Sequence, residues 1–416
     1  MLIKFINRLK GDKVIWVITL VMLFFSLLSV YSFVPILVKV EGGTPFKYLT
    51  KHFIYVIISV IAMLYVLKFP SVFFNKIATF LLIVSAGLLV YTLFFGHKVN
   101  GAGRWISIPF VSLTFQASDV AKLAVVLYLG KMLDKKQAVL KSWKEGFLPI
   151  LLPVILICGL IVKDNFSTAA LLFMVAVILM FIGNVPITKL LTTFAVIGLL
   201  GVSVVLLHKA LPDANLLPRY QTWENRLFNR YSDKAVDDEN YILNNAQAKN
   251  AELGIYSGGV FGQGVGDGKV KEFVPEAYAD FYYASFVEEF GFIGAVLLVL
   301  FYLILFMRMV RIAMKAEKLY EKITVVGIGI IMMTQALVNM LVCTGVFPVT
   351  GQNMPLLAMG GSAMIMTCIS IGIVQGIAAK YNKLTKAEKT EETEKTEEVN
   401  PKEEENPLLN EKISKA

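Results

Sequence analysis

The sequence predicts an all-α polytopic membrane protein with about ten transmembrane helices. Of its 416 residues, 56% are hydrophobic and only 17% are charged, whereas a soluble protein carries roughly 25% charged residues. Long apolar runs are also present, such as VIWVITLVMLFFSLLSVYSFV at 14–34, and a helix needs about 20 mostly apolar residues to cross a bilayer. The spans are expected to be helical, because a helix satisfies its own backbone hydrogen bonds in lipid.

Ten segments are expected to span the membrane, and together they form one membrane domain, 14–384. The first is too long for a removable signal peptide and lacks a small-residue cleavage site. The fourth is unusual because it contains Asp119 and Lys122. A large extracytoplasmic loop, 209–280, is expected between the seventh and eighth spans. The ten segments are 14–39, 52–69, 75–96, 117–133, 146–163, 167–183, 188–208, 281–307, 323–345 and 356–380.

Basic residues set the expected orientation. They cluster before the first span, between the fourth and fifth, and between the eighth and ninth, and with ten spans all three places fall on one face. The positive-inside rule makes that face cytoplasmic. Both termini, beginning with residues 1–13, are then cytoplasmic, and the loops 97–116, 209–280 and 345–356 are outside. The basic residues are Lys4, Arg8, Lys10, Lys13, Lys135, Lys136, Lys141, Lys144, Arg308, Arg311, Lys315, Lys318 and Lys322.

The net charge of +9 is unevenly distributed. Residues 385–416 hold six Lys and ten Glu with little apolar surface, so they are expected to form a disordered, charged cytoplasmic tail. The positive remainder suits an anionic membrane surface, and nothing points to nucleic acid. The three cysteines lie inside apolar spans and are interpreted as small buried side chains. The three histidines show no metal-ligand spacing, so no metal site is predicted.

Ionisable groups at membrane depth are costly, so each is a candidate for function. The stretch NGAGRWISIPFVSLTFQASDVAKL at 100–123 places Arg104 in a loop and Asp119 at the start of a helix. Asp119 and Lys122 are three residues apart, so they share a helix face and can pair. Two interpretations stay open here. The pair is either a structural feature of a capped helix, or Lys122 and Arg104 bind an anionic ligand from the outer leaflet.

The stretch FGQGVGDGKVKEFVPEAYADF at 261–281 leads directly into the eighth span. No strand precedes its glycines, so a dinucleotide loop is excluded. Glycine instead permits positive φ and close backbone approach, and the loop is expected to fold back over the bundle and deliver Glu276 and Asp280. Aromatic neighbours make the surroundings of Asp280 apolar, which suits a general base; a solvated helix cap is the alternative. Glu288 and Glu289 lie deeper and are expected to have partners.

A third polar cluster lies near the end of the chain. Gln335 and Asn339 are four apart, on one face of the ninth span. Two prolines and a glycine at 348–355 predict an irregular connection, and Gly-Gly-Ser at 360–362 permits close helix contact. Irregular backbone at membrane depth is tolerated only where it is buried or lines a cavity.

These stretches carry a resemblance to a known family. NGAGRW with FQASDVAKLAVVLYL, then FVPEAYADFYYASFVEEFGFIG, then QALVNMLVCTGVFPVTGQNMPLLAMGGSA follow in order along the chain. They resemble the motifs of the SEDS proteins (shape, elongation, division and sporulation), the FtsW and RodA relatives. The resemblance runs from the first span to the tenth. PVTGQ, MGGSA and the charged tail lean towards the FtsW cell-division branch.

The resemblance implies a peptidoglycan glycosyltransferase that polymerises lipid II together with a class B penicillin-binding transpeptidase. The essential acid of the family falls on Asp280, which is the expected catalytic residue. The expected substrate-binding residues are Arg104, Asp119, Lys122, Glu276, Gln335 and Asn339. Other expected partners are proteins of the division or elongation machinery, and the expected location is the bacterial cytoplasmic membrane, at the septum if the division branch is right.

The sequence departs from the family pattern at several positions. The usual Glu is Asp119, the His-Thr before the catalytic acid is Tyr278-Ala279, and an Asp of the fifth connection is Asn165, which is therefore not placed in the catalytic set. The family serine before Gly-Gly is replaced as well, because Ala358-Met359 precedes Gly360.

The expected chemistry has Asp280 deprotonate the GlcNAc 4-hydroxyl of one lipid II as it attacks C1 of the MurNAc of another. Arg104 and Lys122 are expected to neutralise the undecaprenyl pyrophosphate that leaves. A divalent cation, Mg or Mn, is open as a helper, although no ligand motif demands one. Two alternatives remain: a lipid II flippase, for which the sequence shows no inverted repeat, and a non-catalytic division scaffold, which does not need Asp280.

Overall fold

Each of the ten expected spans coincides with a helix. The computed structural model describes residues 10–99, 102–108, 113–163, 165–211, 224, 239–274 and 277–399. The ten helices are α2 (Lys13–Glu41), α3 (Pro45–Val66), α4 (Ser71–Phe95), α5 (Ala117–Lys135), α6 (Leu148–Val162), α7 (Phe166–Ile182), α8 (Ile187–Ala210), α11 (Tyr282–Lys315), α12 (Leu319–Cys343) and α13 (Gly361–Val399).

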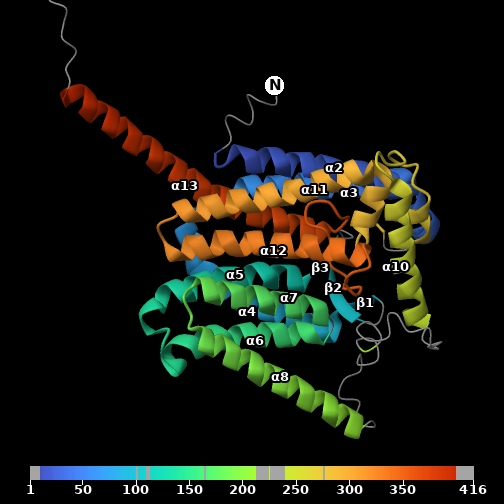
Figure 1. The fold of residues 1–416 in the computed structure, drawn as a ribbon, viewed down its shortest axis with the longest axis horizontal. Coiled ribbons are helices and arrows are strands. Elements are labelled where there is room, and N and C mark those ends of the chain that lie inside the picture. The colour runs from blue at the N-terminus through green and yellow to red at the C-terminus, as the bar shows by residue number, and fades with distance from the viewer. Residues whose placement is uncertain are drawn as a thin grey trace, which may run out of the picture.

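Eight of these helices, among the described residues, are long and apolar enough to cross a membrane, and α7 is a shorter apolar helix. The remaining one, α5, carries Asp119 and Lys122 in its first two turns. The helices run side by side with their long axes nearly parallel, while α8 diverges at the edge of the bundle (Figure 1). These features confirm the expected all-α polytopic membrane fold.

Helix α5 forms the centre of the bundle although it is the least apolar span. It contacts α4, α12, α7, α6 and α13, and most of its side chains are buried. The glycines of its neighbours make this packing close. A Cβ on Gly327 of α12, for example, would lie 2.7 Å from Val126 of α5. The central helix therefore depends on its neighbours to keep its polar groups from lipid.

The connection between α4 and α5 is not the simple loop that the sequence analysis expected. It forms a three-stranded antiparallel sheet of β1 (His97–Val99), β2 (Ala102–Ile108) and β3 (Leu113–Gln116). Trp105 pairs with Gln116, and Ile106 pairs with Phe115. Aromatic and β-branched residues favour such pairing, and the sheet delivers the chain directly into α5. This small sheet is the one element type in the described residues that the all-α prediction missed.

The large connection after α8 contains α10 (Glu239–Gly258) and the short helix η4 (Val270–Phe273). Helix α10 packs against α11 and η4 and lies across the ends of the bundle helices (Figure 1). The connection between α5 and α6 contains η1 (Gln137–Val139) and η2 (Trp143–Phe147). The last helix, α13, continues to Val399, past the expected end of the membrane domain at 384, and the predicted disorder of the charged tail stays a prediction.

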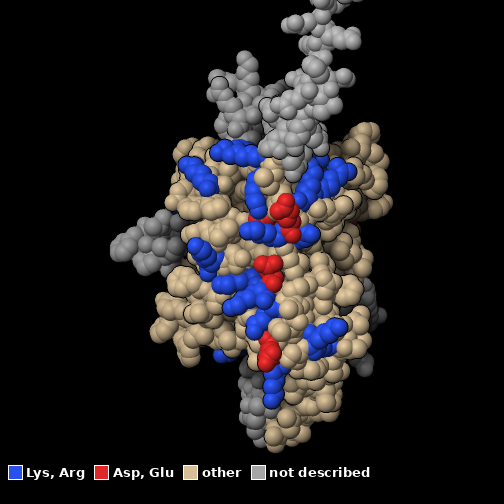
Figure 2. Space-filling view, turned by 90° about the vertical axis from the view of Figure 1, so that its left-hand side faces the viewer, with Lys and Arg blue, Asp and Glu red and all other residues tan. Residues whose placement is uncertain are grey.

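Lysine and arginine side chains gather on the end of the bundle opposite α10 (Figure 2). They come from the C-terminal ends of α5 and α11 and from the connections that follow them, including Lys135, Lys141, Arg311, Lys315 and Lys318. Among the described residues that were expected on one face, these therefore lie together, while Lys4 and Arg8 lie outside the described part of the chain. The sheet, α10 and the turn before α11 lie at the other end (Figure 1).

Candidate functional site

Asp280 lies in a turn, residues 277–281, that leads into the first residue of α11. The turn is bound at two points to neighbouring segments. The Tyr278 carbonyl accepts a hydrogen bond from the backbone N–H of Met359 (3.0 Å), and the Asp280 carbonyl accepts one from Asn339 Nδ2 (2.9 Å). The Asp280 residue is half-buried. Its carboxylate is thus carried by a backbone that other elements hold in place.

The glycine-rich loop before this turn is joined to a break in α11. Gly291 has φ 66° and ψ −169°, which interrupts the helix. Backbone groups that the helix leaves unpaired at the break are bonded to the loop instead. The glycine-rich loop therefore folds back onto the N-terminal part of α11. The four bonds run from Gln263 N to Glu288 O (2.9 Å), Gly264 N to Glu289 O (3.1 Å), Phe292 N to Gly259 O (2.9 Å) and Ile293 N to Val260 O (3.3 Å).

Glu288 and Glu289 have the partners that the sequence analysis expected. Glu289 forms an ion pair with Lys271 (Nζ to Oε1, 2.5 Å), and these two side chains are 3% and 2% exposed. Ser32 of α2 hydrogen-bonds to both of them. Glu288 accepts hydrogen bonds from the backbone N–H groups of Val270 (2.8 Å) and Lys271 (3.1 Å). The two carboxylates therefore fasten η4 and the glycine-rich loop to the N-terminal part of α11.

A second polar centre surrounds the start of α5. Asp119 and Lys122 form the expected ion pair (Oδ1 to Nζ, 2.8 Å), with Asp119 3% and Lys122 16% exposed. The other oxygen of Asp119, Oδ2, accepts a hydrogen bond from Ser362 of α13 (3.0 Å). The Ser362 hydroxyl in turn accepts the backbone N–H of Gln116 (3.2 Å). Ser362 was missed as a functional residue, because the sequence marked Gly-Gly-Ser only as a close helix contact.

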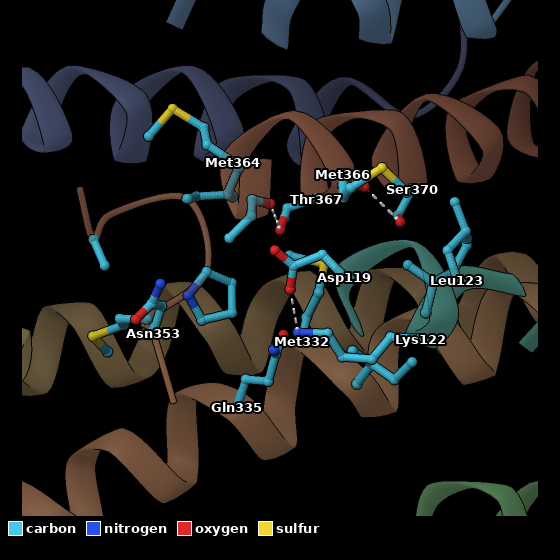
Figure 3. A pocket seen from close by; sticks show the side chains of 17 residues that line it. Asp119, Lys122, Leu123, Met332, Gln335, Asn353, Met364, Met366, Thr367 and Ser370 are labelled. Carbon is cyan, nitrogen blue, oxygen red and sulfur yellow. Dashed lines mark hydrogen bonds and ion pairs between the residues drawn. The ribbon is translucent and has the colours of Figure 1, made fainter. Parts of the chain in front are cut away.

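The Asp119–Lys122 pair borders a cavity of about 40 Å³ between α5, α12, α13 and the connection before α13. Gln335 extends from α12 towards the pair, and Asn353 lies on the opposite side of the cavity (Figure 3). This volume holds a few water molecules and no sugar. A cation, a carboxylate and two amides converge there, and such a set of polar groups can orient a polar ligand.

The remaining predicted site residues are not all in this cavity. Asn339 is fully buried and bonds to main-chain groups instead. Asp280 does not line the cavity either. Arg104 belongs to β2, next to the Trp105–Gln116 pair that precedes α5, but its side chain lies outside the described part of the chain. Glu276 lies outside the described residues altogether. The structure therefore brings together Asp119, Lys122 and Gln335, and separately Asp280 and Asn339.

The described residues contain no group of three or more His, Cys, Asp or Glu side chains placed to hold a metal ion. A divalent cation as a helper in the reaction stays a prediction. The three cysteines, Cys158, Cys343 and Cys368, are buried and free, as the sequence analysis expected.

Comparison with known proteins identifies the family to which this arrangement of helices belongs. A family model described as "Cell cycle protein", for FtsW, RodA and SpoVE, matches residues 12–383. The chain belongs to the FtsW/RodA/SpoVE family. This family is the SEDS family that the sequence motifs resemble, so the match confirms the resemblance.

Curated FtsW/RodA/SpoVE relatives align over most of the chain. A probable peptidoglycan glycosyltransferase FtsW from Trichlorobacter lovleyi is 31% identical over 372 residues, which are 88% of this chain and 93% of the relative. Stage V sporulation protein E of Bacillus subtilis is 28% identical over 380 residues, 89% of this chain and 98% of the relative.

Solved structures have the same fold. One chain, from a structure described as "Structural coordination of polymerization and crosslinking by a peptidoglycan synthase complex", matches with a TM-score of 0.68 at 21% identity and covers 89% of this chain and 98% of that one. The rod shape determining protein RodA of Thermus thermophilus matches with a TM-score of 0.62 at 19% identity, over 89% of this chain and 98% of RodA.

Proposed function

We propose that this protein is a peptidoglycan glycosyltransferase that polymerises lipid II into glycan strands, with Asp280 as the general base. The observation that carries the proposal is the placement of Asp280. It lies just before the start of α11, whereas the basic residues Arg311 and Lys315 are at the other end of that helix, and the backbone of its turn is bound to two other segments. The relatives described as peptidoglycan glycosyltransferases support the same activity.

The reaction needs one proton transfer and one displacement. The GlcNAc 4-hydroxyl of the acceptor lipid II attacks C1 of the donor MurNAc and gives its proton to the Asp280 carboxylate. The bond between C1 and the pyrophosphate oxygen breaks, and its electron pair leaves with undecaprenyl pyrophosphate. Lys122 is the described cation that borders the cavity, and together with Arg104 it would stabilise this charge. Gln335, from the same cavity, would bind neutral polar groups of the substrate.

The basic face is assigned to the cytoplasm by the positive-inside rule, which places both termini inside and Asp280 at the outer leaflet. Lipid II presents its sugars there. A class B penicillin-binding transpeptidase is the proposed partner, because a structural neighbour comes from a complex that combines polymerization and crosslinking. The relatives described as FtsW favour the division branch, and hence other division proteins as partners and the septum as the location.

The test is lipid II polymerisation by the purified protein with its cognate transpeptidase, in the presence of moenomycin to silence polymerases of the other class. Wild type should yield glycan chains and Asp280→Asn none, because a placed base contributes about 10²–10⁴-fold in rate. Asp267→Asn is the matched control, since Asp267 is an exposed carboxylate of the same loop, and it should behave as wild type.

Three results would contradict the proposal. Glycan chains from Asp280→Asn at the wild-type rate would remove Asp280 as the base. Equal loss in Asp267→Asn and Asp280→Asn would mean that the loop is merely sensitive to lost charge. No chains from any variant, combined with lipid II translocation in liposomes, would favour the flippase alternative.

A further inference from the structure

Asn339 hydrogen-bonds both to the Asp280 backbone and to Gln352, next to the segment that lines the cavity. It lies on α12 and is fully buried. Its Nδ2 donates to the carbonyls of Asp280 and Gln352, each at 2.9 Å. Its Oδ1 accepts the backbone N–H of Tyr283 (3.3 Å), in the first turn of α11. No polar atom of this amide remains to face a substrate.

The second acceptor of Asn339, the Gln352 carbonyl, lies next to the wall of the cavity. Gln352 immediately precedes Asn353, the first of several consecutive residues that line the cavity containing Asp119, Lys122 and Gln335. Gln352 is itself held, because its Nε2 donates to Thr168 Oγ1 of α7 (2.6 Å). The wall and the turn with Asp280 are therefore joined through one amide.

A second bond joins the same two segments. The backbone N–H of Met359, at the end of the cavity wall, donates to the carbonyl of Tyr278 (3.0 Å). Residues 278–280 and residues 352–359 are thus connected at both ends. The connection made by Asn339 uses a side chain, so it can be removed by substitution, whereas the Met359–Tyr278 bond runs between main-chain groups.

We propose that Asn339 is a positioning residue, which holds Asp280 at a fixed place relative to the cavity with Lys122. The inference rests on the proposed function, since it assigns the general base and the pyrophosphate-binding cation to these two places. Attack on C1 requires the base and the leaving-group site to be held in one geometry, and a misplacement of about 1 Å can reduce a rate about 10²-fold. Asn339 was expected among the substrate-binding residues, but all polar atoms of its amide are already hydrogen-bonded, which gives it this different role.

The experiment compares Asn339→Leu with Gln375→Met in the lipid II polymerisation assay. Both substitutions replace an amide by an apolar side chain of similar size. Gln375 is also fully buried and bridges two main-chain groups, accepting from Asp12 N (2.6 Å) and donating to Asp12 O (2.9 Å), but it lies at the basic end of the bundle. The two variants should lose similar thermal stability in detergent, whereas only Asn339→Leu should lose activity.

The expected result for Asn339→Leu is a kcat reduced about 10²-fold with an unchanged KM for lipid II. An unchanged kcat with a raised KM would mean that Asn339 binds substrate directly, and would overturn the proposal. So would a kcat equal to that of Gln375→Met. If Asn339→Leu does not fold, Asn339→Asp carries the test, because it keeps the size and the acceptor oxygen of the side chain but cannot donate to both the Asp280 and Gln352 carbonyls. It should lower kcat but not KM, and an unchanged kcat in that variant overturns the proposal.

The same polymerisation assay distinguishes failure of the positioning role from failure of the proposed function. Asp280→Asn inactive with Asn339→Leu fully active would refute the positioning role alone. Asp280→Asn fully active would refute the assignment of the general base, whatever Asn339→Leu does.

Discussion

Replacing Lys271 with methionine is expected to release the glycine-rich loop from α11. The Lys271 and Glu289 side chains are 2% and 3% exposed and lie 2.5 Å apart. Methionine keeps most of the apolar stem but leaves the Glu289 carboxylate buried without a cation. Removing one partner of a buried pair costs about 3–5 kcal/mol. Glu289 keeps two neutral partners, the Ser32 hydroxyl and the backbone N–H of Gly266 (3.4 Å), and these do not compensate for the lost charge.

The rate of limited proteolysis with chymotrypsin measures how often the glycine-rich loop is released from α11. Phe261 and Phe273 flank the anchored part of the loop and are 83% and 68% exposed, but cleavage there requires local opening of the backbone. Cleavage follows the open population when closing is fast. Since about 1.4 kcal/mol is a factor of ten, the expected cost corresponds to cleavage at least about a hundredfold faster.

A second substitution separates the buried charge from the lost contact. Lys271→Met combined with Glu289→Met removes both charges, and an apolar replacement of a buried pair is often neutral, so cleavage should return most of the way to the wild-type rate. Lys269→Met, in the exposed neighbour, should change nothing. The reasoning is refuted if Lys271→Met accelerates cleavage less than about tenfold, roughly 1.4 kcal/mol, or if the double variant is cleaved as fast as the single one.

Two further substitutions test close contacts at the same end of the bundle. Gly262 and Gly266 have similar positive φ angles of 86° and 91°, but a Cβ on Gly262 would lie 2.1 Å from a main-chain carbonyl of α11, whereas one on Gly266 meets nothing within 4 Å. Gly266→Ala should lower the stability of the closed loop by about 1–2 kcal/mol, because alanine is strained in the left-handed backbone conformation. Gly262→Ala should lower it by clearly more in the same cleavage assay, because a steric clash is added. Equal effects of the two substitutions would contradict the steric reasoning. Ser362→Ala removes a hydrogen bond to the Asp119 carboxylate and should lower unfolding stability in detergent by about 1.5–3 kcal/mol, whereas Ser370→Ala, whose hydroxyl bonds within its own helix, should not; an unchanged Ser362→Ala would count against the pairing.

Much of the fold could be predicted because each span carries its signal locally. A run of apolar residues specifies a membrane helix wherever its neighbours lie, so all ten helices could be placed. The pairing of Asp119 with Lys122 was also accessible, since three residues along a helix bring two side chains to one face. The sheet was less accessible. Its strands are only three to seven residues long, too short for a clear alternating pattern.

The candidate site could be predicted only where a contact is local. Asn339 and Asp280 are 59 residues apart, and Ser362 and Asp119 are 243 apart. No pattern within one helix indicates that an amide on α12 meets the backbone before α11. The sequence identified Asn339 and Asp280 as polar residues at membrane depth, but residues that bind substrate and residues that position other groups are of the same types. Only the contacts distinguish the two roles.

The position of α5 at the centre of the bundle has a consequence for how the protein is made. Ionisable side chains in a membrane-spanning segment are costly to expose to lipid, and α5 carries an aspartate and a lysine within its first two turns. Of the elements that cover this part of α5, α4 is synthesised before it, but α12 and Ser362 of α13 emerge much later. Until then the nascent α5 lacks the contacts with α12 and α13 that cover it in the finished fold. A chain truncated before α12 would therefore leave the Asp119–Lys122 pair without these contacts.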